Sequence, residues 1–218
     1  MAIGTDFGGV HSFRDLNLIQ QFVEESPAEP KLNLIDIPGA DGSKDLTTQP
    51  SGRVVYNDRT IIWTFALYPG DNWHAKQRQV SNALNGRRCK ITLDENPDYY
   101  YDGRLIVKEY KRDQVLRQIT VEAVCAPYML AQFETTLSQS INTTEKAILV
   151  VNEFKPAIPT ITVTRETVIE WLGNTFTLTA GTHRLLDIVF PENTIELLYA
   201  KTTSGTGTIK IVYQEGTL

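Results

Sequence analysis

Clustered carboxylates can bind calcium or act as an acid and a base, and the chain holds one such cluster at residues 93–103. The acids in this run are Asp94, Glu95, Asp98 and Asp102. If Asp94 began an EF-hand loop, the position that requires glycine would be Tyr99 and the bidentate glutamate would be Leu105. The run therefore fails as a calcium loop, and we interpret it as a solvated turn that joins two strands.

Three consecutive tyrosines, Tyr99, Tyr100 and Tyr101, lie in the same run. Because successive side chains of a strand point to opposite faces, at least one of the three must face away from its own core. Exposed tyrosine is favoured at protein interfaces and at sugar sites. We predict that these three residues form a protein–protein interface.

The three histidines, His11, His74 and His183, lie far apart, and no second histidine or cysteine stands at a metal-ligand spacing from any of them. The sequence has no nucleophile elbow, phosphate loop or dinucleotide fingerprint, and Gly205 and Gly207 read as part of a hairpin turn. We therefore predict that the protein is not an enzyme and that it carries no catalytic residue, no metal site and no cofactor.

The two cysteines, Cys89 and Cys125, each alternate with apolar residues, which points both side chains into a core. We interpret them as buried thiols. A cross-strand disulfide is the alternative, and a reducing compartment disfavours it. The first residues lack the basic start and the apolar run of an export signal, so we expect folding in a cytoplasm.

The charge and hydropathy of the 218 residues exclude some partners. A formal net charge of -5 gives no overall positive field that would hold nucleic acid by its phosphates. The longest aliphatic stretch, near residues 147–151, is far too short to cross a bilayer. We expect a protein that binds neither nucleic acid nor a membrane.

Hydrophobic residues recur at every second position through most of the chain, which is typical of half-buried antiparallel strands. Strands are predicted at residues 18–23, 31–37, 53–56, 61–67, 89–93, 105–110 and 118–124, and then at 147–151, 160–164, 168–172, 175–179, 183–190, 194–200 and 208–213.

Residues 73–84 are the exception and predict one amphipathic helix. One face of this helix carries its apolar residues, Trp73, Val80, Ala83 and Leu84. We expect Asp71 to cap the N-terminus and Gly86 to end the helix in a left-handed conformation.

The alternation of apolar residues divides the chain into two domains. It stops near residues 126–128, and residues 132–144 are rich in serine, threonine, glutamine and asparagine, so residues 131–145 are expected to be a linker. We predict that residues 1–130 form an N-terminal antiparallel β-sandwich with one packed helix, and that residues 146–218 form a second β-sandwich. The fold class is therefore mostly β.

Several segments of the first half resemble, in order, the N-terminal domain of siphophage distal tail proteins, the Dit-like phage tail components. They are residues 35–47 (IDIPGADGSKDLT), residues 84–94 and residues 99–104 (YYYDGR). The ending, residues 205–218, resembles the closing strand of that family's C-terminal, galectin-like domain. The resemblance covers nearly the whole chain and adds a galectin-like fold to the expectation for residues 146–218.

The resemblance implies a structural protein of the tail tip or baseplate, in which six copies form a ring. The N-terminal domains would build the ring and the C-terminal domains would project outward. One face would meet the tail-tube protein and the other the tail-associated hub or lysin protein, with receptor-binding proteins or fibres around the side. The implied location is the virion tail tip of a phage or prophage, after assembly in the bacterial host cytoplasm.

Two other functions compete with this one. A carbohydrate-binding module for adhesion to the host cell surface would use exposed aromatic residues such as Trp171 or Tyr199. A glycosidase acting on cell-wall sugars would need two acids of residues 93–103 to flank a cleft. An exposed Trp171 would support the first function, and converging carboxylates would support the second.

Overall fold

The computed structural model describes residues 3–68, 70–112 and 117–218. It consists of two compact units, the first ending at Met129 and the second spanning Leu130–Thr217. Most of the chain is in strands and one helix is present among the described residues, so the predicted mostly-β fold is confirmed.

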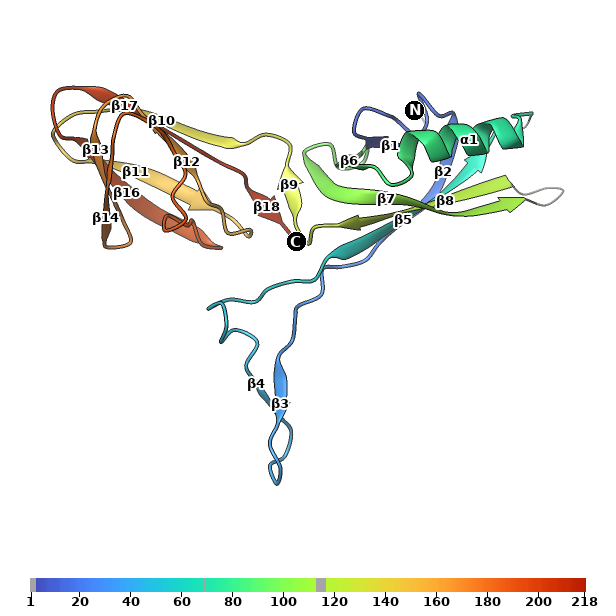
Figure 1. Ribbon diagram of the computed structural model, residues 1–218, viewed down its shortest axis with the longest axis horizontal. Helices are drawn as coiled ribbons and strands as arrows, with labels where there is room; N and C mark the ends of the chain where they lie inside the picture. The colour runs from blue at the N-terminus through green and yellow to red at the C-terminus, as the bar shows by residue number, and fades with distance from the viewer. Residues whose placement is uncertain (1–2, 69, 113–116) are drawn as a thin grey trace. The chain divides into compact units, whose positions relative to one another are not determined.

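Unit 1 is built on one antiparallel sheet with the strand order β1-β6-β7-β8-β5-β2 (Figure 1). Its strands are β1 (Thr5–Phe7), β2 (Leu18–Glu25), β5 (Arg59–Leu67), β6 (Arg88–Leu93), β7 (Tyr99–Arg112) and β8 (Arg117–Cys125). Because alternate side chains of a strand point to the same face, one face of β5 lies against the core, and its residues Ile61, Trp63 and Phe65 are fully buried. Phe7 of β1 packs edge-on against Trp63 and Phe65, with ring centroids 5.1 and 6.3 Å apart.

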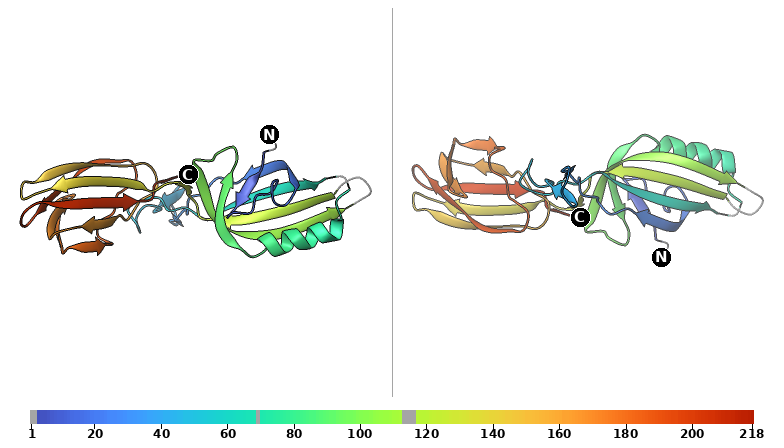
Figure 2. Two further views of the ribbon diagram at one scale, coloured as in Figure 1. Left: turned by 90° about the horizontal axis from the view of Figure 1, so that it is seen from above. Right: turned by 90° about the horizontal axis from the view of Figure 1, so that it is seen from below.

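The helix α1 (Trp73–Leu84) has the predicted bounds and runs alongside the strands of unit 1 (Figure 2). Its N-cap is Asn72 and not Asp71 as predicted, because the Asn72 side chain accepts a hydrogen bond from the backbone N–H of Ala75 at 3.1 Å. After the helix, Gly86 has a positive φ of 78°, as expected. Trp73 packs edge-on against Tyr110 of β7, which joins helix and sheet.

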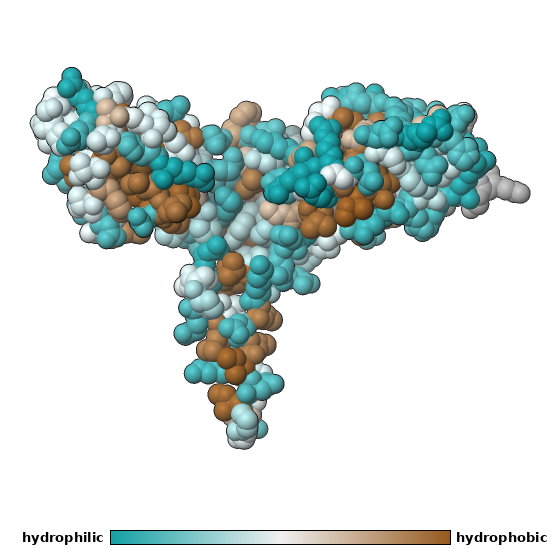
Figure 3. All heavy atoms as spheres, in the orientation of Figure 1, coloured by the Kyte–Doolittle hydropathy of each residue, from teal (hydrophilic) through white to brown (hydrophobic). Residues whose placement is uncertain are grey.

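Between β2 and β5 lies a hairpin of β3 (Leu34–Asp36) and β4 (Ser43–Asp45). Every residue from 29 to 45 is exposed, including Leu32, Leu34, Ile35 and Ile37, and Figure 3 shows the hydrophobic colour on this segment. We call residues 29–45 the arm. Its two strands pair with each other, and among the described residues no second layer of structure covers its apolar side chains.

Unit 2 is a β-sandwich of two four-stranded antiparallel sheets, as predicted. One sheet has the order β10-β17-β12-β15 and the other β11-β16-β13-β14. The strands are β10 (Thr135–Ile141), β11 (Lys146–Asn152), β12 (Thr160–Val163), β13 (Thr167–Trp171), β14 (Asn174–Leu178), β15 (Gly181–His183), β16 (Thr194–Thr202) and β17 (Gly207–Tyr213). The short strands β9 (Met129–Ala131) and β18 (Gly216–Thr217) pair with each other.

The core of unit 2 is centred on three aromatic rings from separate segments. Phe190 packs edge-on against both Trp171 and Tyr213, with ring centroids 5.0 Å apart in each pair. Aliphatic side chains from both sheets surround these rings, among them Ile161, Ile169, Leu198 and Ile211. Arrangements of this kind add to the free energy gained from burying the rings.

The structure differs from the prediction at residues 131–145, which were expected to link the domains. They contain β10, which pairs along its whole length with β17. Threonine and serine fit a strand whose outer face is solvated, so a polar composition is compatible with a strand at this position.

Two predicted strands are also absent. Residues 53–56 contribute only an isolated bridge between Pro30 and Tyr56, and β15 ends at His183 instead of reaching Phe190. Ile188 and Phe190 are fully buried without lying in a strand, so apolar residues there fill the core from a loop.

Asn152, at the end of β11, is a buried polar residue that holds two loops of unit 2. Its Nδ2 lies 3.0, 3.1 and 2.8 Å from the carbonyl oxygens of Lys155, Phe190 and Pro191. Within the described residues, its Oδ1 has no hydrogen-bond partner. Replacing this buried amide would be costly, because each of the three carbonyl oxygens would lose its hydrogen-bond donor.

We expect Asn152→Asp to lower the free energy of unfolding by about 3 kcal/mol. A neutral carboxyl group has fewer donors for the three carbonyl oxygens than the amide has, and an ionised carboxylate would place a buried negative charge beside them. Urea unfolding measures the change. Asn174→Asp, at an exposed position on β14, is the matched control and should change it by less than about 0.5 kcal/mol. Equal stability of the two variants would contradict the assigned role.

Candidate functional site

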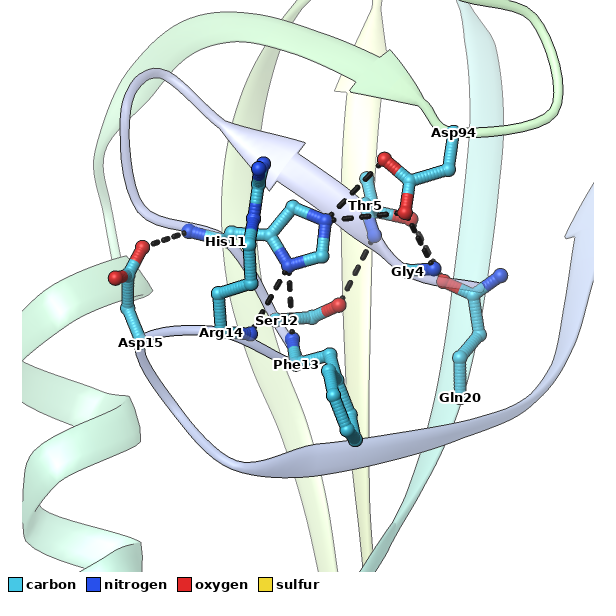
Figure 4. A network of polar contacts seen from close by, with 9 residues as sticks. All are labelled: Gly4, Thr5, His11, Ser12, Phe13, Arg14, Asp15, Gln20 and Asp94. Atoms are coloured by element: carbon cyan, nitrogen blue, oxygen red, sulfur yellow. Dashed lines mark hydrogen bonds and ion pairs between the residues drawn. The ribbon is translucent and has the colours of Figure 1, made fainter. Parts of the chain in front are cut away.

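A polar network around His11 is the place where the structure brings together residues of a kind used in catalysis (Figure 4). His11 is buried, and its Nε2 lies 3.2 and 3.1 Å from the two carboxylate oxygens of Asp94. Asp94 also accepts a hydrogen bond from the backbone N–H of Gly4 at 2.9 Å. The pairing of β1 with β6 places these residues side by side although 83 positions separate His11 from Asp94.

The second ring nitrogen of His11 is also engaged. Its Nδ1 lies 3.1 Å from the backbone nitrogens of both Phe13 and Arg14, whose N–H groups can only donate. Nδ1 must therefore be the acceptor, and Nε2 carries the proton that is donated to Asp94. With both nitrogens occupied, His11 has no lone pair free to act as a general base.

The neighbouring hydroxyl groups are occupied in the same way. The Oγ of Ser12 accepts a hydrogen bond from the backbone N–H of Thr5 at 2.9 Å, and the Thr5 hydroxyl donates to Gln20 at 2.7 Å. Serine, histidine and aspartate thus lie together without the order of contacts that activates a nucleophile. The network holds the first strand and its loop on the sheet.

The four acids of residues 93–103 have separate surroundings. Asp94 contacts His11, while Asp102 forms a two-pronged ion pair with Arg88 at 3.1 and 2.7 Å, whose hydrogen bond lowers the pKa of the Asp102 carboxyl. Glu95 and Asp98 are exposed. Among the described residues, no three His, Cys, Asp or Glu side chains are grouped as metal ligands. This arrangement gives the glycosidase hypothesis no support.

The tyrosine run does not lie in a solvated turn, because β7 begins at Tyr99. Tyr101 is buried on the core side, where its hydroxyl donates to Glu25 and Arg59 lies 5.1 Å from the ring centroid. Burial and the Glu25 hydrogen bond raise the pKa of Tyr101. Tyr100 is buried beneath Lys90, whose Nζ lies 4.2 Å from the ring centroid.

Tyr99 is half-buried and is the member of the run with surface left to offer. Cation–π and packing contacts explain why Tyr100 is covered even though it faces away from the main core. The interface role of Tyr99, Tyr100 and Tyr101 stays a prediction. Tyr99 would make most of such a contact, because the other two side chains are buried within the chain.

The cysteines lie in one row across three strands. Cys89 of β6 is opposite Gly103 of β7, and Gly103 is opposite Cys125 of β8. A strand therefore separates the two sulfur atoms, and both thiols are free. A Cβ atom at position 103 would lie 2.4 Å from the Cys125 Sγ, so glycine makes room for the buried thiol. Burial raises the pKa of Cys125 to about 12 and also raises that of the half-buried Cys89.

The outer face of the β11–β16 strand pair is apolar and exposed. Leu149 pairs with Leu197 and Val151 with Ile195 across the two strands, and all four side chains are between 43% and 73% exposed. We call these four residues the β11–β16 patch. Figure 3 shows the hydrophobic colour on the part of unit 2 that carries these strands.

Neither the arm nor this patch was identified from the sequence. Alternating apolar residues predict a strand with one covered face, and only the packing shows that the expected cover is missing. Single exposed apolar residues are ordinary, whereas groups of them mark interaction sites. These two groups are therefore the candidate functional surfaces of the chain.

Trp171, a candidate for sugar binding, is buried, and its Nε1 donates to the carbonyl of Val189 at 2.9 Å. It supports the core and cannot stack on a ligand. Tyr199 is half-buried on β16, where it faces Ala147. The burial of Trp171 counts against the carbohydrate-binding hypothesis, because a tryptophan in the core of the sandwich cannot contact a sugar.

Comparison with known proteins gives a match of fold. No protein-family model and no curated protein matches the sequence. Among solved structures, the crystal structure of the SPP1 Dit (gp 19.1) protein, described as a paradigm of the hub adsorption apparatus in phages that infect Gram-positive bacteria, is similar to the chain. The TM-score is 0.67, the sequence identity is 16%, and the match covers 100% of both chains. The fold implied by the resemblance to distal tail proteins is thus confirmed.

No helix of the described residues is long and apolar enough to span a membrane.

We expect His11→Ala to lower the free energy of unfolding by about 2–3 kcal/mol, since it leaves a part-buried carboxylate and two backbone N–H groups without their partner. His74→Ala, on the exposed face of α1, is the control and should change it by less than about 0.5 kcal/mol. Thermal unfolding of both variants checks this. A His11→Ala protein as stable as the control would show that the network is dispensable.

We expect Cys89 to react with a thiol reagent at pH 8 and Cys125 to remain unmodified in the folded protein. The thiolate is the reactive form, and a pKa of about 12 leaves only about one Cys125 in 10,000 ionised at that pH. Ellman's reagent should therefore count one thiol in buffer, none in Cys89→Ser, and two in wild-type protein in urea. A fast reaction of Cys125 in folded Cys89→Ser would refute the burial described above.

Proposed function

We propose that the chain is a structural protein of a phage tail tip and that six copies form a ring joining the tail tube to the tail-associated hub. The observation that carries the proposal is the likeness to SPP1 Dit over the full length of both chains. Because both units take part in the match, the likeness concerns a two-unit architecture and not one common sandwich.

The surface of unit 1 supports self-assembly. The arm exposes four aliphatic side chains that a monomer leaves in water, and a two-stranded hairpin alone is at best marginally stable. A ring contact that covers the arm would remove both difficulties. Head-to-tail rings need two different surfaces on each copy, and the arm can serve as one of them.

The polar groups of the chain support a structural role. His11, Asp94 and Asp102 make internal contacts that hold strands together. A protein whose candidate acid–base residues are occupied in this way works through its surfaces. We propose the tail-tube protein, the hub or lysin protein, and receptor-binding proteins or fibres as its partners, with Tyr99 among the contact residues.

Net charge fits a ring through which DNA passes. The chain has 26 acidic and 21 basic residues, and a surface of negative net charge does not retain phosphates. The ring would be assembled in the bacterial host cytoplasm and would act at the tip of the virion tail.

The test is the mass and shape of the assembled protein. We expect light scattering of the purified full chain, alone or with the tail-tube or hub protein, to show a species six times the 24.5 kDa of one copy. Negative-stain images should show sixfold rings. A protein that remains monomeric at high concentration, and forms no ring with either partner, would refute the proposed function.

A further inference from the structure

The chain returns from the arm to β5 through a segment that is paired over a short length only. We call residues 53–57 the root of the arm; they lie outside the named strands. The Lys31 N–H donates to the carbonyl of Val55 at 2.8 Å, and the Asn57 N–H donates to the carbonyl of Glu29 at 2.8 Å. A ribbon of this length is marginally stable by itself. Side-chain contacts are therefore needed to fix where the root lies.

Tyr128 supplies such contacts from the segment that follows β8. Its side chain is buried, although it belongs to neither of the two hydrophobic cores. Its ring packs edge-on against Tyr56 of the root, with ring centroids 6.1 Å apart. Its hydroxyl oxygen lies 3.3 Å from Nη1 of Arg53, which also donates to the carbonyl of Val54 at 3.2 Å. We call Arg53, Tyr56 and Tyr128 the latch.

Arg59, the first residue of β5, adds a buried contact beside the latch. Its Nε donates to the carbonyl of Ser26, which follows β2, at 3.0 Å, and its Nη1 lies 3.5 Å from the carbonyl oxygen of Pro127. Because the arm is inserted between β2 and β5, Ser26 and Arg59 stand at the two ends of that insertion. The residue before Tyr128 is thus held to both ends of the insertion that carries the arm.

The latch lies close in sequence to the start of unit 2. Unit 2 begins at Leu130, shortly after Tyr128. In β9, the Ala131 N–H donates to the carbonyl of Glu215 at 3.1 Å, and the Ala131 carbonyl accepts from Nε2 of Gln214 at 2.8 Å. A shift of Tyr128 would therefore reach a backbone hydrogen bond of unit 2 through a short length of chain.

We propose that the latch couples the position of the arm to the segment from which unit 2 begins. Coupling of this kind works in both directions, because one contact holds both sides. Loosening the root of the arm would loosen β9, and loosening residues 127–128 would loosen the root. The inference concerns a single chain and does not depend on the proposed ring.

Hydrogen exchange of single amides, measured by NMR on the purified full chain, tests the coupling from both sides. Arg53→Ala removes the arm side of the latch, and we expect the Ala131 amide to exchange at least about threefold faster. Tyr128→Phe keeps the aromatic ring but removes the hydroxyl group. The Lys31 and Asn57 amides should then exchange at least about threefold faster.

Two amides and one variant serve as controls. The N–H groups of Gly86 in unit 1 and Phe190 in unit 2 each donate to a backbone carbonyl at 2.8 Å, and their exchange should change by less than about twofold. Arg78→Ala, at an exposed position on α1, matches Arg53→Ala in chemistry and should leave all of these amides unchanged. Light scattering on the same samples checks that each variant has the assembled mass of the wild type.

The combination of Arg53→Ala with Tyr128→Phe should accelerate the Ala131 amide little more than the faster of the two single variants, because both remove the same contact. Faster exchange on the side of the latch that was not mutated, with unchanged control amides, supports the proposal. Faster exchange confined to the mutated side would overturn the coupling, as would control amides that accelerate as much as Ala131. Additive effects of the two substitutions would overturn the assignment of Tyr128 as the partner of Arg53.

Discussion

The alternation of side chains along antiparallel strands is the constraint on which this protein depends. Every strand buries one residue in two only if something covers that face. In unit 1, the helix and the first strand supply cover for β5 and β7, and in unit 2 the two sheets cover each other. The apolar side chains of the arm and of the outer face of β11 and β16 are exposed, with no cover among the residues that the structure describes.

Polar residues help to hold the paired strands and their loops in place. Asp94 with His11, and Arg88 with Asp102, join strands that are distant in sequence, and Asn152 joins two loops to a strand end. These contacts occupy the groups that could have carried acid–base chemistry. The arm and the β11–β16 patch, in contrast, are groups of apolar side chains that remain exposed.

Periodicity predicted the parts of the fold in which local pattern and burial agree. Residues 73–84 form the expected helix because their apolar residues share one face, and β5 follows from four apolar residues at alternate positions. The N-cap was assigned to Asp71 instead of its neighbour Asn72, since both residues are good caps and only the backbone geometry distinguishes them. β10 was missed because a polar strand has the composition of a linker.

The candidate site was less predictable than the fold. The interface role predicted for Tyr100 stays a prediction; the contact of Lys90, on the adjacent strand, with its ring depends on strand register and could not be predicted from the sequence. His11 and Asp94 meet only because β1 pairs with β6. The exposed state of Ile35 and Leu197 depends on the absence of a covering layer, which no local pattern encodes.

The uncovered arm has a consequence for how the protein matures. A hairpin that is stabilised by contact with a neighbouring copy becomes ordered only when that copy is bound. Closing the ring would then complete the folding of each member, so that the last copy added completes the structure of the first. Building the tail tip and finishing the fold would be one cooperative event, and a lone copy would remain, in this segment, an unfinished protein.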